Sequence, residues 1–254
     1  MSRTARLVNP LLLTGLMILP EALLPDEIRL AVASNFAPAM KTLVSRFEQE
    51  SGHEVRLSFG STGKQYAQII NGAPFDAFFA ADTARPERLE AEGQAIAGSR
   101  FTYARGKLVL WSPDPGKVDA EGHVLSRDSF RFLAIANPKL APYGEAARQV
   151  LQHLELWVGL EPRLVRGENI GQAFQFVRSG NADLGFVAWS QLVAANLVNT
   201  GSNWSVPALL HDPIDQQAVR MSKREAVGDF IAFVRSTEGQ AIIIQNGYEI
   251  PDVD

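Results

Sequence analysis

Short apolar runs alternate along the chain with segments whose apolar residues recur every three or four positions. The runs have the length of buried strands, and the periodic segments have the spacing of amphipathic helices. The predicted strands are Ile28–Ala33, Glu54–Phe59, Asp76–Ala80, Lys107–Trp111, Phe132–Ala136 and Leu184–Ala188. The helical patterns are Met40–Phe47, Tyr66–Ile70, Ala146–Leu154, Ala173–Val177, Lys223–Ser236 and Glu238–Asn246. A strand followed by a helix, repeated in this way, predicts an α/β fold with mainly parallel sheets flanked by helices.

The alternation pauses at two places, which we interpret as crossings between two lobes. The strand-like run Arg105–Pro113 leads into a loop-rich stretch, and His211–Val219 precedes the last two helical patterns. If the chain crosses at both places, one lobe is discontinuous and is closed by the C-terminal helices. The predicted lobe one is therefore residues 27–106 and 216–254, and the predicted lobe two is residues 107–215. A ligand cleft is expected between them.

The first 22 residues differ from the rest of the chain. Arg3 and Arg6 precede a leucine-rich stretch bounded by Pro10 and Pro20. This stretch is shorter than the roughly 20 residues that a membrane span needs, and its arrangement is typical of a secretory signal peptide. We therefore predict a signal peptide at residues 1–22 and an exported, soluble protein of the periplasm; an uncleaved anchor is the alternative.

Composition narrows the possible chemistry. The 254 residues are 46% hydrophobic and carry a formal net charge of −4, which argues against a disordered chain and against a nucleic-acid binder. The absence of cysteine removes disulfides, thiolate metal sites and the usual lipid-anchor residue. The four histidines are dispersed, and neither G-x-S-x-G nor H-E-x-x-H occurs. We expect no catalytic residues, no cofactor and no protein-coordinated metal cation.

Small polar residues stand where predicted strands run into predicted helices. Ser34 and Asn35 follow the first strand, and Gly60–Lys64 follows the second. Free backbone N–H groups at a helix N-terminus stabilise small anions. Each fragment alone is equally consistent with an N-cap, in which a hydroxyl such as that of Ser61 satisfies those N–H groups. The second fragment is no P-loop, because Ser58 stands where that motif needs glycine.

Two further loops feed helix N-termini in the same way. They are Pro142–Gly144, which contains Tyr143, and Glu168–Ile170. Taken singly, they are ordinary caps, but four such loops together indicate a cage of donors for a small anion. Lys64 could neutralise an anion; however, a lysine in the first turn of a helix usually faces water, so we leave it outside the predicted site.

The chain resembles the molybdate-binding periplasmic proteins of ABC importers. The resemblance extends over nearly all of the mature region and is carried by ordered blocks, including ASNFAPAMKTLVSRFEQESGHEV, FGSTGKQYAQIINGAPFDAFFAADTARPERLEAEG, ANPKLAPYGEAARQVL, GENIGQAFQFVRSGNADLGFVAWSQL and PIDQQAV. It implies a two-lobed type II periplasmic binding protein whose lobes close over a tetrahedral oxyanion. The ligand-binding residues that the resemblance implies are Ser34, Asn35, Ser61, Tyr143 and Ile170.

The chain departs from the family pattern at one position. Many members have a ligand tyrosine just after the Gly-[Ile/Phe]-Val strand, where this chain has Ala188 followed by Trp189. Tyr143 could supply the missing hydroxyl from another direction. The departure leaves the number of donors, and therefore the fine selectivity, open.

The resemblance implies a monomeric receptor that captures molybdate, and also tungstate, and delivers it to an ABC permease in the inner membrane. The physical chemistry of the ligand agrees, because a doubly charged oxyanion has only acceptor oxygens and is matched by neutral donors. A protonated phosphate would leave its O–H unpaired in such a site. A receptor for sulfate or chromate is the alternative within the binding class, and an exported hydrolase on the same scaffold is the remote alternative.

Overall fold

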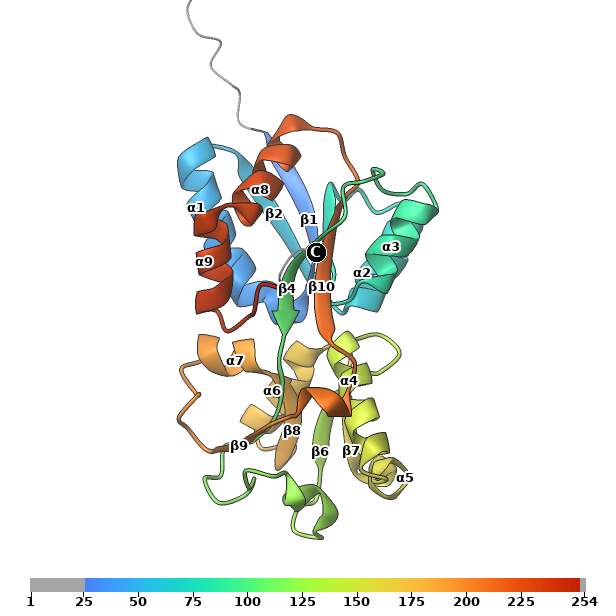
Figure 1. The fold of residues 1–254 in the computed structure, drawn as a ribbon, viewed down its shortest axis with the longest axis vertical. Helices are drawn as coiled ribbons and strands as arrows, with labels where there is room; N and C mark the ends of the chain where they lie inside the picture. The colour runs from blue at the N-terminus through green and yellow to red at the C-terminus, as the bar shows by residue number, and fades with distance from the viewer. Residues whose placement is uncertain (1–25, 252–254) are drawn as a thin grey trace, which may run out of the picture.

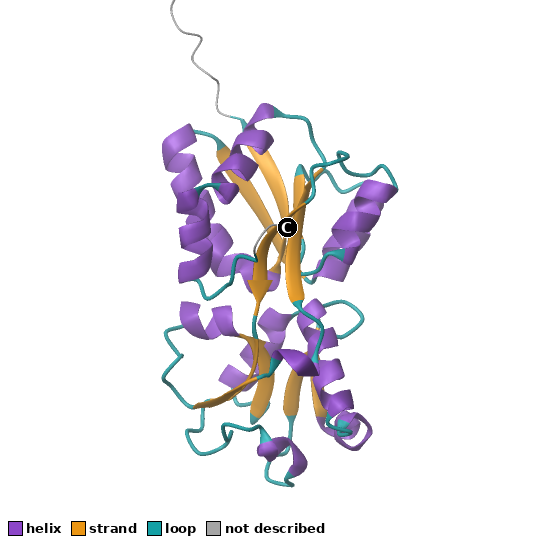
Figure 2. Cartoon of the chain, viewed as in Figure 1, coloured by secondary structure: helices purple, strands orange, loops and turns teal. Residues whose placement is uncertain are grey.

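Two five-stranded sheets, each flanked by helices, form two lobes stacked along the long axis of the molecule (Figures 1 and 2). The computed structural model describes residues 26–251, so the predicted signal peptide lies outside the described residues. The sheet of lobe one has the order β2 (Glu54–Gly60), β1 (Glu27–Ala33), β3 (Ala77–Phe79), β10 (Ile214–Arg220) and β4 (Phe101–Gly106). The sheet of lobe two has the order β7 (Leu164–Gly167), β6 (Leu133–Ala136), β8 (Leu184–Ala188), β5 (Leu108–Ser112) and β9 (Ser202–Ser205).

Both sheets combine a parallel half with an antiparallel half. In lobe one, β1 pairs in parallel with β2 and β3, whereas β10 runs antiparallel to β3 and β4. In lobe two, β6 pairs in parallel with β7 and β8, whereas β5 runs antiparallel to β8 and β9. The predicted two-lobed α/β fold is confirmed, but the sheets are half antiparallel rather than mainly parallel, because the strands that connect the lobes run antiparallel to their neighbours.

The helices of lobe one cover both faces of its sheet (Figure 1). One apolar core lies under α1 (Ala37–Ser51), α8 (Glu225–Arg235) and α9 (Thr237–Gln245). A smaller core lies under α2 (Thr62–Ile70) and α3 (Ala84–Ala91). In α1, Met40, Leu43 and Phe47 are buried at helical spacing, and the helix ends at Gly52, whose φ of +74° suits a residue without a side chain.

Lobe two has one continuous core, which its helices share. These are α4 (Pro142–His153), α5 (Trp157–Leu160), α6 (Ile170–Arg178) and α7 (Trp189–Ala194). The buried faces of α4 and α6 supply Val150, Leu151, Ala173 and Val177. Among residues 26–251, no helix is both long and apolar enough to cross a membrane.

Two adjacent strands carry the chain between the lobes. β4 ends at Gly106 and β5 begins at Leu108, so a single residue separates the two sheets on the outward path. The return path enters β10 at Ile214, which pairs with Gly106. The two crossings are therefore held side by side, as Figure 1 shows for β4 and β10. Such a paired connection lets two rigid lobes rotate about a short hinge.

Candidate functional site

A small cavity lies where the carboxyl ends of the parallel strands of both sheets face each other. The volume open to the centre of a water-sized sphere is about 10 Å³. Its walls include Ala33 and Gly60, the last residues of β1 and β2. Ligands of open α/β sheets bind outside these strand ends. The lining residues are Ala33, Ser34, Asn35, Gly60, Ser61, Thr62, Ala81, Ala141, Pro142, Tyr143, Asn169 and Ile170.

All five sequence-predicted site residues lie on this cavity. Lobe one contributes Ser34, Asn35 and Ser61, and lobe two contributes Tyr143 and Ile170. They come from four loops that are far apart in the sequence, and the fold brings them together. Their role as ligands stays a prediction.

Lobe one supplies two serines with different local roles. Ser61 is the N-cap of α2, and its Oγ accepts the backbone N–H of Lys64 at 3.3 Å. Neither α1 nor the short helix Ser34–Phe36 before it has a side-chain cap, so the hydroxyl of Ser34 is not used in capping. A Cβ added at Gly171 would lie 3.9 Å from the Oγ of Ser34, so Ser34 faces the first turn of α6 across the cleft. Because the Ser61 hydroxyl only accepts in its capping bond, it can still donate to an anion, so the N-cap and anion-site interpretations of Ser61 are compatible.

Lobe two supplies the N-termini of α4 and α6. Pro142 is the first residue of α4, and Tyr143 follows it. Ile170 is the first residue of α6, and Asn169 caps that helix by accepting the N–H of Gln172 at 3.1 Å. First-turn N–H groups of a helix have no partner within the helix. Those of Tyr143 and Ile170 have no backbone acceptor among residues 26–251.

The electrostatics of the cavity come from dipoles rather than from charges. No acidic, basic or histidine residue is among the described lining residues. The first residues of α2, α4 and α6, and of the short helix Ser34–Phe36 that leads into α1, line the cavity, and a helix N-terminus carries a partial positive charge. Burial raises the pKa of the Tyr143 hydroxyl well above its ordinary value, so this group stays protonated and can donate. The arrangement suits an anion that accepts hydrogen bonds and donates none.

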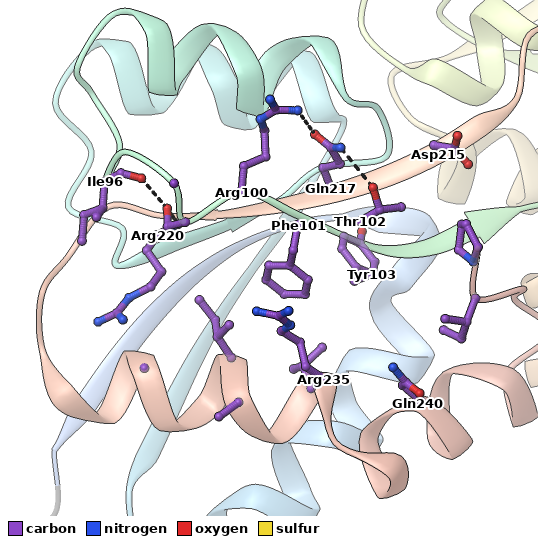
Figure 3. A pocket seen from close by; sticks show the side chains of 18 of the residues that line it. Ile96, Arg100, Phe101, Thr102, Tyr103, Asp215, Gln217, Arg220, Arg235 and Gln240 are labelled. Atoms are coloured by element: carbon purple, nitrogen blue, oxygen red, sulfur yellow. Dashed lines mark hydrogen bonds between the residues drawn. The ribbon is translucent and has the colours of Figure 1, made fainter. Parts of the chain in front are cut away.

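A larger hollow of about 1080 Å³ lies elsewhere, on lobe one between β4, β10 and α8. Figure 3 shows Arg100 reaching Gln217, which in turn contacts Thr102. The lining of this hollow carries charged side chains, among them Arg100, Asp215 and Arg235. The small cavity instead is lined by the first residues of α2, α4 and α6 and lies between the two lobes, so we take it as the candidate site.

Comparisons with known proteins agree on the family. The sequence profile described as "Bacterial extracellular solute-binding protein" matches residues 28–249. The chain belongs to this family. Molybdate-binding protein ModA of Azotobacter vinelandii is 51% identical over 84% of this chain and 86% of its own length. Molybdate-binding protein ModA of Rhodobacter capsulatus is 45% identical over 87% of this chain and 88% of its own length. The solved periplasmic molybdate-binding protein of Azotobacter vinelandii superposes with a TM-score of 0.85, at 44% identity, and covers 89% of this chain and 100% of the other.

These relatives confirm the resemblance stated from the sequence blocks. They are solute-binding proteins rather than enzymes, which agrees with the expectation of a binding role for this one. The two-sheet architecture is that of the solved relative.

In this solute-binding protein, Asn35 also has a role that sequence reasoning missed. Its amide Nδ2 donates to Gln216 Oε1 at 2.8 Å and lies 3.1 Å from the hydroxyl of Tyr248. The Tyr248 hydroxyl donates to the Asn35 carbonyl at 2.7 Å. The side chain of Asn35 is therefore engaged in a buried network beside the hinge.

Gln216 is the centre of that network and spans the two lobes. It is fully buried on β10, where a β-bulge separates it from Gln217. Its Nε2 donates to the hydroxyl of Tyr143 at 3.2 Å, and its Oε1 accepts from Asn35. The Tyr143 hydroxyl therefore reaches the hinge, and the residue itself lines the cavity. A fully buried glutamine inside a strand is the feature that could have marked this position, but burial is not visible in sequence.

The position expected to hold a tyrosine is occupied differently. Ala188 is buried at the end of β8, and its N–H donates to the side chain of Gln191 at 3.0 Å. The same side chain donates to the carbonyl of Ile170 at 3.1 Å. Gln191 therefore ties the end of β8 to the first turn of α6, which it holds in place beside the cavity.

Proposed function

We propose that this protein captures molybdate in the periplasm by closing its two lobes over the anion, and that it delivers molybdate to an ABC permease of the inner membrane. Tungstate, which has the same charge and shape, is the second expected ligand. The observation that carries the proposal is the small cavity, which is walled by the first residues of α2, α4, α6 and the short helix before α1, and whose described lining residues carry no charge. The identity to the two ModA proteins supports molybdate as the ligand.

The donor set also supports release and selectivity. Neutral hydroxyls and amides stabilise a dianion without a fixed cation, so the ligand can leave when the lobes open. Hydrogen phosphate carries an O–H that would meet donors in this cavity and remain unpaired. Sulfate differs from molybdate mainly in size, so the volume of the closed cavity is expected to separate them.

The proposal is tested by isothermal titration of the mature protein with molybdate, tungstate, sulfate and phosphate. Each hydrogen bond to a charged ligand contributes about 1.5–3 kcal/mol, so Ser34→Ala and Ser61→Ala should each weaken molybdate binding about 10- to 150-fold. Ser45→Ala, on the exposed face of α1, is the matched control and should leave binding unchanged. Binding of sulfate or phosphate in preference to molybdate would refute the proposed cargo. Unchanged molybdate affinity in both cavity variants would refute the site.

A further inference from the structure

An ion pair joins the two lobes beside the cavity. Lys64 on α2 places its Nζ 3.1 and 3.3 Å from the two carboxylate oxygens of Glu168, which belongs to lobe two. The backbone N–H of Lys64 donates to Ser61, and Glu168 directly precedes Asn169 and Ile170. Each partner is therefore attached to a segment that lines the cavity.

Further contacts join the two lobes around this ion pair, and we call this contact region, between residues 63–85 of lobe one and residues 139–168 of lobe two, the seam. The N–H of Gly63 donates to the carbonyl of Leu140 in lobe two at 2.8 Å. Arg85 in lobe one lies 3.4 Å from the carbonyl of Lys139. A Cβ on Gly63 would come within 3.0 Å of the Leu140 oxygen, so the seam has no space for a side chain there.

The charges at this seam act on an anion in the cavity as well as on each other. Glu168 is a carboxylate near a site that we propose to bind a dianion, and alone it would repel that ligand. Lys64 offsets this repulsion only when the lobes are closed, since the two residues are on different lobes. Their side chains are 52% and 33% exposed, which makes the pair sensitive to salt.

We infer that Lys64 and Glu168 form an electrostatic latch, which slows the escape of the bound oxyanion and cancels the repulsion between that anion and Glu168. This inference rests on the proposed function. It assigns Lys64 a positioning role outside the lining of the cavity, and it explains why an acidic residue is tolerated beside a site for an anion.

The latch predicts an asymmetric double-mutant cycle for molybdate. Lys64→Met leaves Glu168 uncompensated and should weaken molybdate binding and speed its dissociation. Glu168→Gln alone should have a smaller effect, because it removes both the attraction between Glu168 and Lys64 and the repulsion between Glu168 and the bound anion. Added to Lys64→Met, it should restore part of the loss, with a coupling of about two- to fivefold, as exposed ion pairs give in such cycles. Raising the ionic strength should speed dissociation from the wild type more than from the double variant.

Arg46 and Glu238 provide the matched control pair. Both belong to lobe one, they lie 2.6 Å apart, and their side chains are 48% and 45% exposed. Arg46→Met and Glu238→Gln should leave molybdate affinity and dissociation unchanged, because the pair does not span the cleft. Thermal unfolding without ligand checks that the Lys64 and Glu168 variants are folded.

Affinities from titration and dissociation rates from stopped-flow tryptophan fluorescence decide between the outcomes. If the wild-type protein does not bind molybdate, the proposed function fails, and the latch fails with it. If the wild type binds molybdate but the four members of the cycle dissociate at the same rate, the latch alone is overturned. Partial rescue of Lys64→Met by Glu168→Gln, together with a weaker salt dependence of dissociation in the double variant than in the wild type, supports it.

Discussion

Gly106 is the residue of the hinge whose substitution should report on the link between hinge and cavity. A Cβ at this position would lie 2.0 Å from the Tyr143 hydroxyl and 2.8 Å from Gln216 Nε2. Tyr143 is 1% exposed and Gln216 is fully buried, so neither side chain can swing into solvent. Gly106→Ala must therefore displace Tyr143 and break its hydrogen bond to Gln216.

The expected magnitude follows from these two effects. Overpacking a buried site costs about 1–3 kcal/mol, and a lost buried hydrogen bond costs about 1 kcal/mol more. Gly106→Ala should lower the free energy of unfolding by about 2–4 kcal/mol. It should also weaken molybdate binding, because Tyr143 lies in the first turn of α4 and lines the cavity. Urea unfolding followed by tryptophan fluorescence and titration with molybdate measure the two effects.

A second substitution makes the reasoning refutable. Tyr143→Phe removes the oxygen that an added Cβ would meet, so Gly106→Ala should cost less in the Phe background than in the wild type. The two losses should therefore sum to more than the loss in the double variant. Gly159→Ala is the control, because an added Cβ there meets no atom of residues 26–251 within 4 Å. Equal costs of Gly106→Ala in both backgrounds would show that the hydroxyl is not the obstacle.

Two further substitutions test the supports of the site. Gln191→Ala leaves the buried N–H of Ala188 unpaired and removes the hydrogen bond to the first turn of α6. The free energy of unfolding should fall by about 1–3 kcal/mol, and molybdate affinity should fall with it. An unchanged affinity would contradict the role of Gln191 in positioning α6. Burial acts to raise the pKa of Asp183, but backbone N–H donors before β6 and nearby cations outweigh it, so its pKa lies below the ordinary value. The stabilising contribution of Asp183 is therefore complete above about pH 4, the pKa of an unfolded aspartate, and is lost as the pH falls through the lower folded pKa. In Asp183→Asn, the free energy of unfolding should therefore fall less steeply as the pH is lowered. An unchanged acid transition would contradict this.

The sequence predicted the elements whose pattern is local. The six predicted strands correspond to β1, β2, β3, β5, β6 and β8, and the last two helical patterns correspond to α8 and α9. Four strands were missed as strands, namely β4, β7, β9 and β10. β7 and β9 include polar residues within only four positions, unlike the wholly apolar β3 and β6, and β4 and β10 mix charged and apolar residues.

The sequence predicted those residues of the candidate site that belong to local motifs. Ser34, Ser61, Tyr143 and Ile170 stand at strand-to-helix junctions, which are visible in sequence, and all lie on the cavity. Gln216 and Gln191 could not be found in this way, because their importance depends on what they contact across the fold. The same holds for Lys64, whose partner Glu168 is 104 residues away.

The discontinuity of lobe one has a consequence for the order in which the protein folds. Strand β10 sits in the interior of the lobe-one sheet, between β3 and β4, yet it comes after every strand of lobe two. The strands of lobe two are all present once the chain has reached Ser205, whereas the sheet of lobe one lacks a central strand until Arg220. Contacts of such large sequence separation form slowly, because a long loop must close first. The lobe that begins later in the sequence is therefore the one whose sheet can be completed first as the chain emerges, and lobe one assembles onto it from both ends.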